Sequence, residues 1–254
     1  MPAPRPTARL EHFTGFLPRL AAATEAVLNF TGGTAVMTLD DRLAAPMQIG
    51  PEMASLNMGT MKLTLHPMPG RARTWHHDWA RPVLEASEDP VFGNTPRDTA
   101  HILTTPGQGR STRFEFECHD LSHLYMLRHF ADRGMVTPPV FIQFVFGALG
   151  GMGPDAENLT HMVRIADKLF GGDHLFSVLA AGRHQMPLLV AAMGGHVRLG
   201  LEDSLTIGRG QLARSNAVQV ARIRSVVETL GRRVMPPDEV RRVLGLKGAT
   251  QVAL

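Results

Sequence analysis

Two segments of the chain alternate strictly between polar and apolar residues. They are residues 194–204, GGHVRLGLEDS, and residues 111–119, STRFEFECH. A period of two predicts β-strands whose two faces lie in different environments. For residues 194–204, an edge strand with one solvated face would also explain the pattern. The polar faces carry His196, Arg198, Gly200 and Glu202 in the first segment, and Arg113, Glu115, Glu117 and His119 in the second.

Strand-like and helix-like runs alternate along the chain, which is typical of parallel βαβ units. The run VFIQFVF at residues 140–146 is almost wholly apolar, so burial on both faces is expected there. We expect strands at residues 26–31, 51–57, 111–119, 140–146, 175–180 and 195–202, and helices at residues 11–24, 121–133, 156–169, 186–193, 212–230 and 237–244.

The repeated polar faces favour a barrel, because inward charges on several strands of a β/α series must converge on one interior. In a (β/α)8 barrel the outward faces pack on helices, and the carboxyl ends of the strands form the site. Arg198 would then meet Glu115 or Glu117. A Rossmann-type sheet is the alternative, but no Gly-x-Gly-x-x-Gly follows an early strand. The strand-end residues expected at the mouth are Thr31, Ser55, Asn57, Gln143, Arg183, Glu202 and Asp203.

The connection between the second and third strands is unusually long. Residues 61–92 are expected to form a lid-like loop, which Trp75 and Trp79 would help to pack. His76, His77 and Asp78 within it make a weak metal site, because adjacent side chains diverge. The pattern of His119, Asp120 and His123, at the end of the third predicted strand and the start of the next helix, is likewise more typical of structural histidines than of metal ligands.

Composition limits the compartment and the partners. The 254 residues with 44% hydrophobic content are expected to form one domain, residues 1–254. A single cysteine, Cys118, fits a reducing compartment, and the chain shows neither a signal core nor a membrane-length apolar run, so a soluble cytoplasmic protein is expected. The net charge of +3 comes from scattered basic residues, with a dense group only on the C-terminal helix and no aromatic side chains between them. Nucleic acid is therefore not expected as a partner, whereas a phosphate-bearing small molecule remains compatible.

Several motifs resemble one known family. GGHVRLGLEDS, GRHQMP, PEMASLNMGTM, FEFECHDLSHLY, FIQFVFGALGG and SNAVQVARIR are similar, in order and spacing, to motifs of the β-keto acid cleavage enzymes, the family of 3-keto-5-aminohexanoate cleavage enzyme. The resemblance runs almost from end to end. It implies a zinc-dependent (β/α)8 barrel that reacts a β-keto acid with acetyl-CoA, giving acetoacetate and a new acyl-CoA. A role in amino acid catabolism and a homo-oligomer would follow.

The resemblance also implies roles for individual residues. Glu202 would be a zinc ligand and Asp203 the catalytic base, while Arg198 would hold the substrate and stabilise negative charge. Thr31 and Ser55 would bind the keto acid, and Glu115 or Glu117 would be the acidic group of the middle strand. Such chemistry needs an electrophile that polarises oxygen, a base and a cation.

The chain departs from the family pattern at its start. The family's first two strands, which carry a glutamate and a His-x-His zinc pair, have no counterpart, so an open barrel of about six parallel strands is expected. Either the true start lies upstream of Met1, or the chain is a truncated, non-catalytic relative that binds an acyl-CoA or a partner subunit. A different metal-dependent barrel, such as a hydrolase, is a third alternative.

Overall fold

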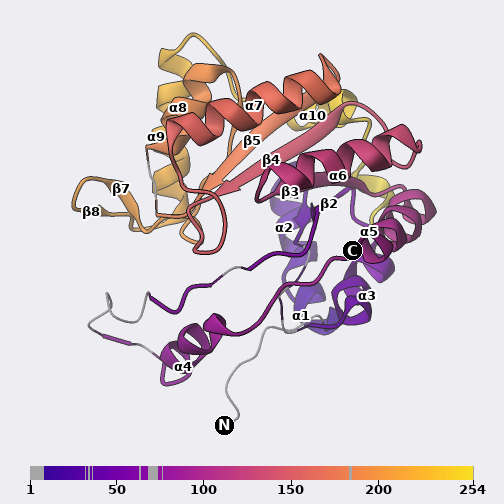
Figure 1. Ribbon diagram of the computed structural model, residues 1–254, viewed down its shortest axis with the longest axis horizontal. Coiled ribbons are helices and arrows are strands. Elements are labelled where there is room, and N and C mark those ends of the chain that lie inside the picture. Colours follow the sequence, from indigo (N-terminus) through magenta and orange to yellow (C-terminus); the bar gives the residue numbers. More distant parts are fainter. Residues whose placement is uncertain are drawn as a thin grey trace.

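The chain folds as an open TIM-type α/β barrel. The computed structural model describes residues 9–31, 33, 35, 37–62, 64–67, 74–75, 77–182 and 185–253. Six parallel strands lie side by side in chain order (Figure 1). Most of the helices between them pack outside the curled sheet, whereas the helix over residues 80–85 lies apart from it (Figure 1). The strands are β1 (Asn29–Phe30), β2 (Met53–Asn57), β3 (Arg113–Cys118), β4 (Val140–Phe146), β5 (His174–Ala180) and β6 (His196–Val197).

The helices begin and end close to many of the predicted limits. The helices predicted over residues 121–133, 156–169, 186–193 and 237–244 are confirmed. The helix predicted over residues 11–24 is instead two helices, because the first ends at Gly15 and a second begins shortly after it, with Pro18 in its first turn. The α-helices are α1 (Leu10–Thr14), α2 (Leu17–Ala23), α3 (Leu39–Ile49), α4 (Ala80–Glu85), α5 (Pro96–Ile102), α6 (Leu121–Asp132), α7 (Ala156–Phe170), α8 (Met186–Met193), α9 (Asn216–Thr229) and α10 (Pro237–Leu244). None in the described part of the chain is long and apolar enough to cross a membrane.

The register of the sheet gathers the polar side chains on its concave face. Ser55 pairs with Glu115, and Glu117 pairs with both Asn57 and Gln143. Gln143 in turn pairs with Ser177. Because side chains alternate along each strand, these polar groups point to the same side. The two-faced pattern predicted from the sequence is therefore confirmed for β3.

The opposite face of the sheet supports the main hydrophobic core. Ile142, Phe144 and Phe146 of β4 are completely buried, and so are Leu124 of α6 and Met162 of α7 in the same apolar cluster. The inward side chain of Gln143 is also completely buried. The prediction that β4 is buried on both faces is confirmed, and a rigid core holds the polar face in place.

The sheet does not close. β1 and β6 are its two end strands, and no pairing joins them among the described residues. This confirms the predicted gap between the first and last strands. An unclosed parallel sheet leaves strand edges with unpaired backbone groups.

The last strand is much shorter than predicted. β6 contains only His196–Val197, whereas the alternating pattern predicted a strand through Glu202. Beyond it the chain turns, and the backbone N–H groups of Asp203 and Ser204 donate to the carbonyl of Gly200 at 3.0 and 2.9 Å. A turn follows no strand alternation, so Glu202 and Asp203 are not forced onto opposite faces.

Several elements were not predicted. Helices α3 and α5 begin with capping boxes, in which Thr38 pairs with Asp41 and Thr95 pairs with Asp98. A π-helical stretch, Leu103–Gln108, follows α5, and a small hairpin of β7 (Thr206–Gly208) and β8 (Gln211–Leu212) precedes α9. The predicted lid-like loop holds α4 and the short helix Ala86–Glu88 in its described part.

Helix α10 is fastened to the amino end of β2 by a buried ion pair. Arg241 donates to both carboxylate oxygens of Glu52, at 2.9 to 3.2 Å, and the Glu52 side chain is only 3% exposed. Bidentate geometry of this kind offsets the desolvation of a buried carboxylate. The contact lies at the end of β2 away from the polar cluster.

Candidate functional site

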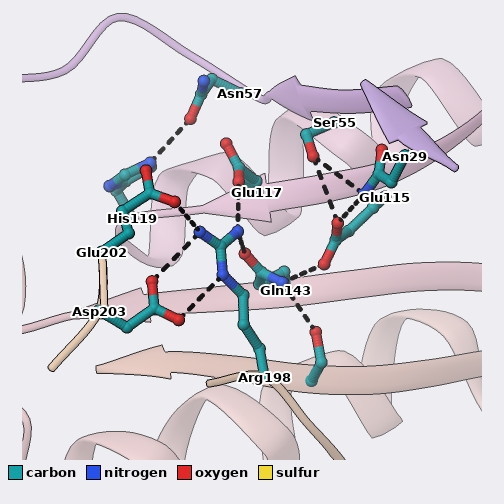
Figure 2. Close-up of polar contacts among 11 residues, drawn as sticks. Asn29, Ser55, Asn57, Glu115, Glu117, His119, Gln143, Arg198, Glu202 and Asp203 are labelled. Atoms are coloured by element: carbon teal, nitrogen blue, oxygen red, sulfur yellow. Dashed lines mark hydrogen bonds and ion pairs between the residues drawn. The ribbon is translucent and has the colours of Figure 1, made fainter. Parts of the chain in front are cut away.

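Arg198 is the centre of a polar cluster at the carboxyl ends of the strands. Its guanidinium donates to Gln143 Oε1 at 2.8 Å and to Glu117 Oε1 at 3.4 Å. It also reaches both carboxylate oxygens of Asp203, at 3.2 and 3.3 Å, and Glu202 Oε2 at 3.3 Å. Figure 2 shows the guanidinium between these groups. A single rigid cation therefore connects β3, β4 and the turn after β6.

Glu115 forms the second part of the cluster. Its carboxylate accepts hydrogen bonds from Asn29 Nδ2 and Gln143 Nε2, and from Ser55 Oγ at 3.3 Å (Figure 2). Asn29 Nδ2 also donates to Ser55 Oγ at 3.2 Å. Neighbouring strands β1 to β4 supply these groups, so the curl of the sheet itself brings them together.

Gln143 joins the two parts. Its amide oxygen accepts from Arg198, and its amide nitrogen donates to Glu115 and to Ser177 Oγ at 3.2 Å. This orientation of the amide satisfies a cation on one side and a carboxylate on the other. Gln143 therefore fixes the distance between Arg198 and Glu115.

The cluster is buried and contains more acids than bases, and the pKa values of its two strand glutamates are raised. Burial raises the pKa of Glu117 to about 7, helped by the neighbouring charge of Glu115 and opposed by Arg198. Burial also raises the pKa of Glu115, against Arg198 and its three hydrogen-bond donors. A carboxyl group that titrates near neutral pH can take up or release a proton during a reaction.

His119 lies at the rim of this cluster as a neutral residue. Its Nε2 is 2.8 Å from Asn57 Oδ1, and its backbone N–H donates to Nδ1 of His123 at 3.2 Å. Burial and the adjacent His123 lower the pKa of His119 to about 4, and burial lowers that of His123 as well. These contacts support the structural interpretation of both histidines, with His119 holding the side chain of Asn57.

The structure assembles most of the predicted site residues. The expected meeting of Arg198 with an inward glutamate is confirmed for Glu117. Thr31 is exposed and shares a pocket with Ser55 beside the cluster. Arg183 and His76 lie outside the described residues. Asn29 was missed, although its place two residues before Thr31 puts it on the same face of the first strand.

Glu202 and Asp203 differ in their surroundings. The side chain of Glu202 is 86% exposed, whereas that of Asp203 is 8% exposed and held by the fork of Arg198. The backbone N–H of Gly182 also donates to the carbonyl of Asp203 at 2.7 Å. Asp203 is thus fixed within the cluster, and Glu202 faces the open side.

The described residues alone do not fit a zinc site. No group of three histidine, cysteine, aspartate or glutamate side chains in this part of the chain is placed to hold a metal ion. Protein zinc sites use three or four such ligands. Glu202 could supply one of them, since its carboxylate is exposed and contacts only Arg198 among the described ion pairs.

Two of three curated relatives of the chain are named as acetyl-CoA transferases. A 3,5-dioxohexanoate:acetyl-CoA acetone transferase of Paraburkholderia graminis is 51% identical over 240 residues, covering 93% of this chain and 77% of the relative. A 3-dehydrocarnitine:acetyl-CoA trimethylamine transferase of Rhizobium meliloti is 33% identical, covering 84% and 63%. A 3-keto-5-aminohexanoate cleavage enzyme of Fusobacterium nucleatum is 31% identical, covering 85% and 69%.

A solved structure and a family model also match the chain. The apo structure of ObcA superposes with a TM-score of 0.67 at 18% identity, covering 94% of this chain and 55% of that one, which supports the barrel fold. Residues 2–246 match the family described as beta-keto acid cleavage enzyme. The chain therefore belongs to the beta-keto acid cleavage enzyme family.

Proposed function

We propose that the chain catalyses the reaction of a β-keto acid with acetyl-CoA, R–CO–CH2–COO⁻ + CH3–CO–SCoA → R–CO–SCoA + CH3–CO–CH2–COO⁻. One carbon–carbon bond breaks in the keto acid, and another forms between its CH2–COO⁻ part and the acetyl group. Family membership and the acetyl-CoA-dependent names of the relatives support this reaction. The first keto acid to test is 3,5-dioxohexanoate, because it is named in the 51% identical relative.

The observation that carries the proposal is the position of Arg198 against Asp203. The reaction needs removal of a proton between two carbonyl carbons and stabilisation of the negative charge that results. Asp203, the buried carboxylate held by Arg198, is the base in this proposal. Arg198 binds the substrate carboxylate or the enolate oxygen, for which its planar fork is suited.

The other predicted residues transfer a proton or position the keto acid. Glu117, with its pKa raised to about 7, exchanges the proton that moves during cleavage. Ser55 and Thr31 present hydroxyl groups to the substrate from the β1 and β2 side. Glu115 keeps Ser55 and Gln143 oriented through its hydrogen bonds.

Zinc dependence, with Glu202 as a ligand, is also part of the proposal. It rests on the family resemblance, and a full set of ligands would need groups from outside the described residues. Zinc would polarise the keto oxygen of the bound substrate. The steps assigned above to Arg198, Asp203 and Glu117 do not depend on that assignment.

A panel of β-keto acids incubated with acetyl-CoA tests the proposal. Mass spectrometry should detect a new acyl-CoA that carries the R group of the active keto acid, together with acetoacetate. Asp203→Asn should abolish both products. Asp238→Asn is the matched control, since Asp238 also contacts an arginine but is 90% exposed on α10. Absence of both products across the panel would contradict the proposal.

A further inference from the structure

A second feature adjoins the catalytic cluster and is not used by the chemistry assigned above. It is a cleft between α8, α9 and the segment over residues 198–207, and Arg198 and Asp203 are among the residues that line it. The cleft is neither enclosed nor flat, and it opens to solvent. The cleft therefore leads from the reacting groups toward the surface.

Gln219 in the wall of the cleft has an unsatisfied polar atom. Its side chain is buried, with 6% of the residue exposed, and its Nε2 donates to the carbonyl of Ser204 at 2.7 Å. Its Oε1 has no hydrogen-bond partner in the part of the chain that the structure describes. A buried acceptor without a donor is destabilising, so this atom calls for a donor, which a bound ligand could supply. The missing partner must be a donor, because an amide oxygen only accepts.

The remaining lining defines the shape and polarity of that ligand. Leu188, Leu199, Ile207 and Ile223 make the cleft mainly apolar. Arg222 also lines it, and this residue is exposed on the solvent side of α9. A ligand that fits is long and mostly apolar, carries an amide N–H along its length, and has an anionic group at its outer end.

We infer that this cleft holds the pantetheine arm of the acetyl-CoA co-substrate, with Gln219 Oε1 accepting from a pantetheine amide and Arg222 facing the phosphates. The inference rests on the proposed function for the identity of the co-substrate. The acetyl thioester then lies beside Arg198 and Asp203 in the cleft. Gln219 is a binding residue for the co-substrate in this account, and it does not touch the keto acid.

Calorimetric titration with CoA and with pantetheine tests the assignment without any need for turnover. Gln219→Met should weaken the binding of both probes by about fivefold to tenfold, as expected for one lost hydrogen bond in a buried site. Gln251→Met is the matched control, because Gln251 Nε2 also donates to a backbone carbonyl at 2.7 Å, far along the chain and exposed. Arg222→Gln should weaken the binding of CoA but not that of pantetheine.

A second variant covers the case in which Gln219→Met fails to fold. Leu188→Phe narrows the cleft from α8 and should weaken the binding of both probes as well. The inference is overturned by undetectable binding of CoA to the wild-type chain, or by unchanged affinity in the variants that fold. Production of acetoacetate with an unchanged KM for acetyl-CoA in Gln219→Met would reject the cleft and keep the proposed function. Binding of CoA that depends on Gln219, without turnover of any keto acid, would support the cleft and reject the proposed function.

Discussion

Glu117→Gln should change how the stability of the protein depends on pH. The pKa of Glu117 rises from 4.5 to about 7 in the folded chain, chiefly because the carboxylate is buried. Its side chain is only 13% exposed, so solvent screens this effect little. In the unfolded chain the group should titrate near its ordinary value. Between the two values, the folded state keeps a proton that the unfolded state has released.

The sign and the size follow from proton linkage. Because the folded state binds more protons, the contribution of Glu117 to stability is full below the unfolded pKa and is lost as pH rises through about 7. A difference of about 2.5 in pKa, at about 1.36 kcal/mol for each, corresponds to about 3 kcal/mol. Glutamine stays neutral at every pH and can still accept from Arg198. The variant should therefore gain about 3 kcal/mol relative to the wild type between about pH 4.5 and about pH 8.

Urea unfolding of both proteins across this pH range, with a chelator present, measures the difference directly. Glu202→Gln is the control, since Glu202 contacts the same arginine but its side chain is 86% exposed. Its stability relative to the wild type should stay nearly constant with pH. A flat difference for Glu117→Gln, or one that falls as pH rises, would refute the reasoning about the buried acidic cluster.

Three further changes probe other parts of the structure. Arg198→Lys should lower kcat/KM by at least about 30-fold, equivalent to about 2 kcal/mol, because lysine cannot hold several partners at once; near-normal kinetics would mean a purely structural role. In a protein that carries the full set of zinc ligands, Glu202→Gln should reduce bound zinc in metal analysis, whereas Asp203→Asn should keep the zinc and lose turnover. Equal loss of zinc in both variants would contradict the separate roles. Arg241→Leu should lower the free energy of unfolding in urea by about 3 kcal/mol, because it leaves Glu52 buried without a partner. A loss below about 1 kcal/mol would mean that this ion pair contributes no more than an ordinary surface pair.

The repeating parts of the fold could be predicted from the sequence because they depend on local periodicity. The buried run over β4, the helix α8 after β5 and the helix α10 beginning at Pro237 have the predicted limits. Alternation on β3 placed Glu115 and Glu117 on the inner face, and from there the approach of one of them, Glu117, to Arg198 followed.

The irregular parts could not be predicted, because longer-range contacts decide them. Residues 198–202 continue a strand pattern, yet the chain leaves the sheet after Val197 and makes a turn instead. A strand at the edge of a sheet pairs with only one neighbour, so an alternating sequence alone does not keep the chain in the sheet there. The bridging role of Gln143 depends on which groups lie on both neighbouring strands, and the pattern of β4 alone does not show them.

Isotope transfer tests the central proposal most directly. The protein is incubated with unlabelled 3,5-dioxohexanoate and acetyl-CoA carrying ¹³C in both acetyl carbons, and the acetoacetate is examined by NMR. The proposed bond exchange predicts label at the keto carbon and the methyl carbon of acetoacetate, none at the carboxylate or the adjacent CH2, and an equal amount of unlabelled new acyl-CoA. Unlabelled acetoacetate, or label in its carboxylate half, would contradict the exchange of acyl groups around Arg198 and Asp203.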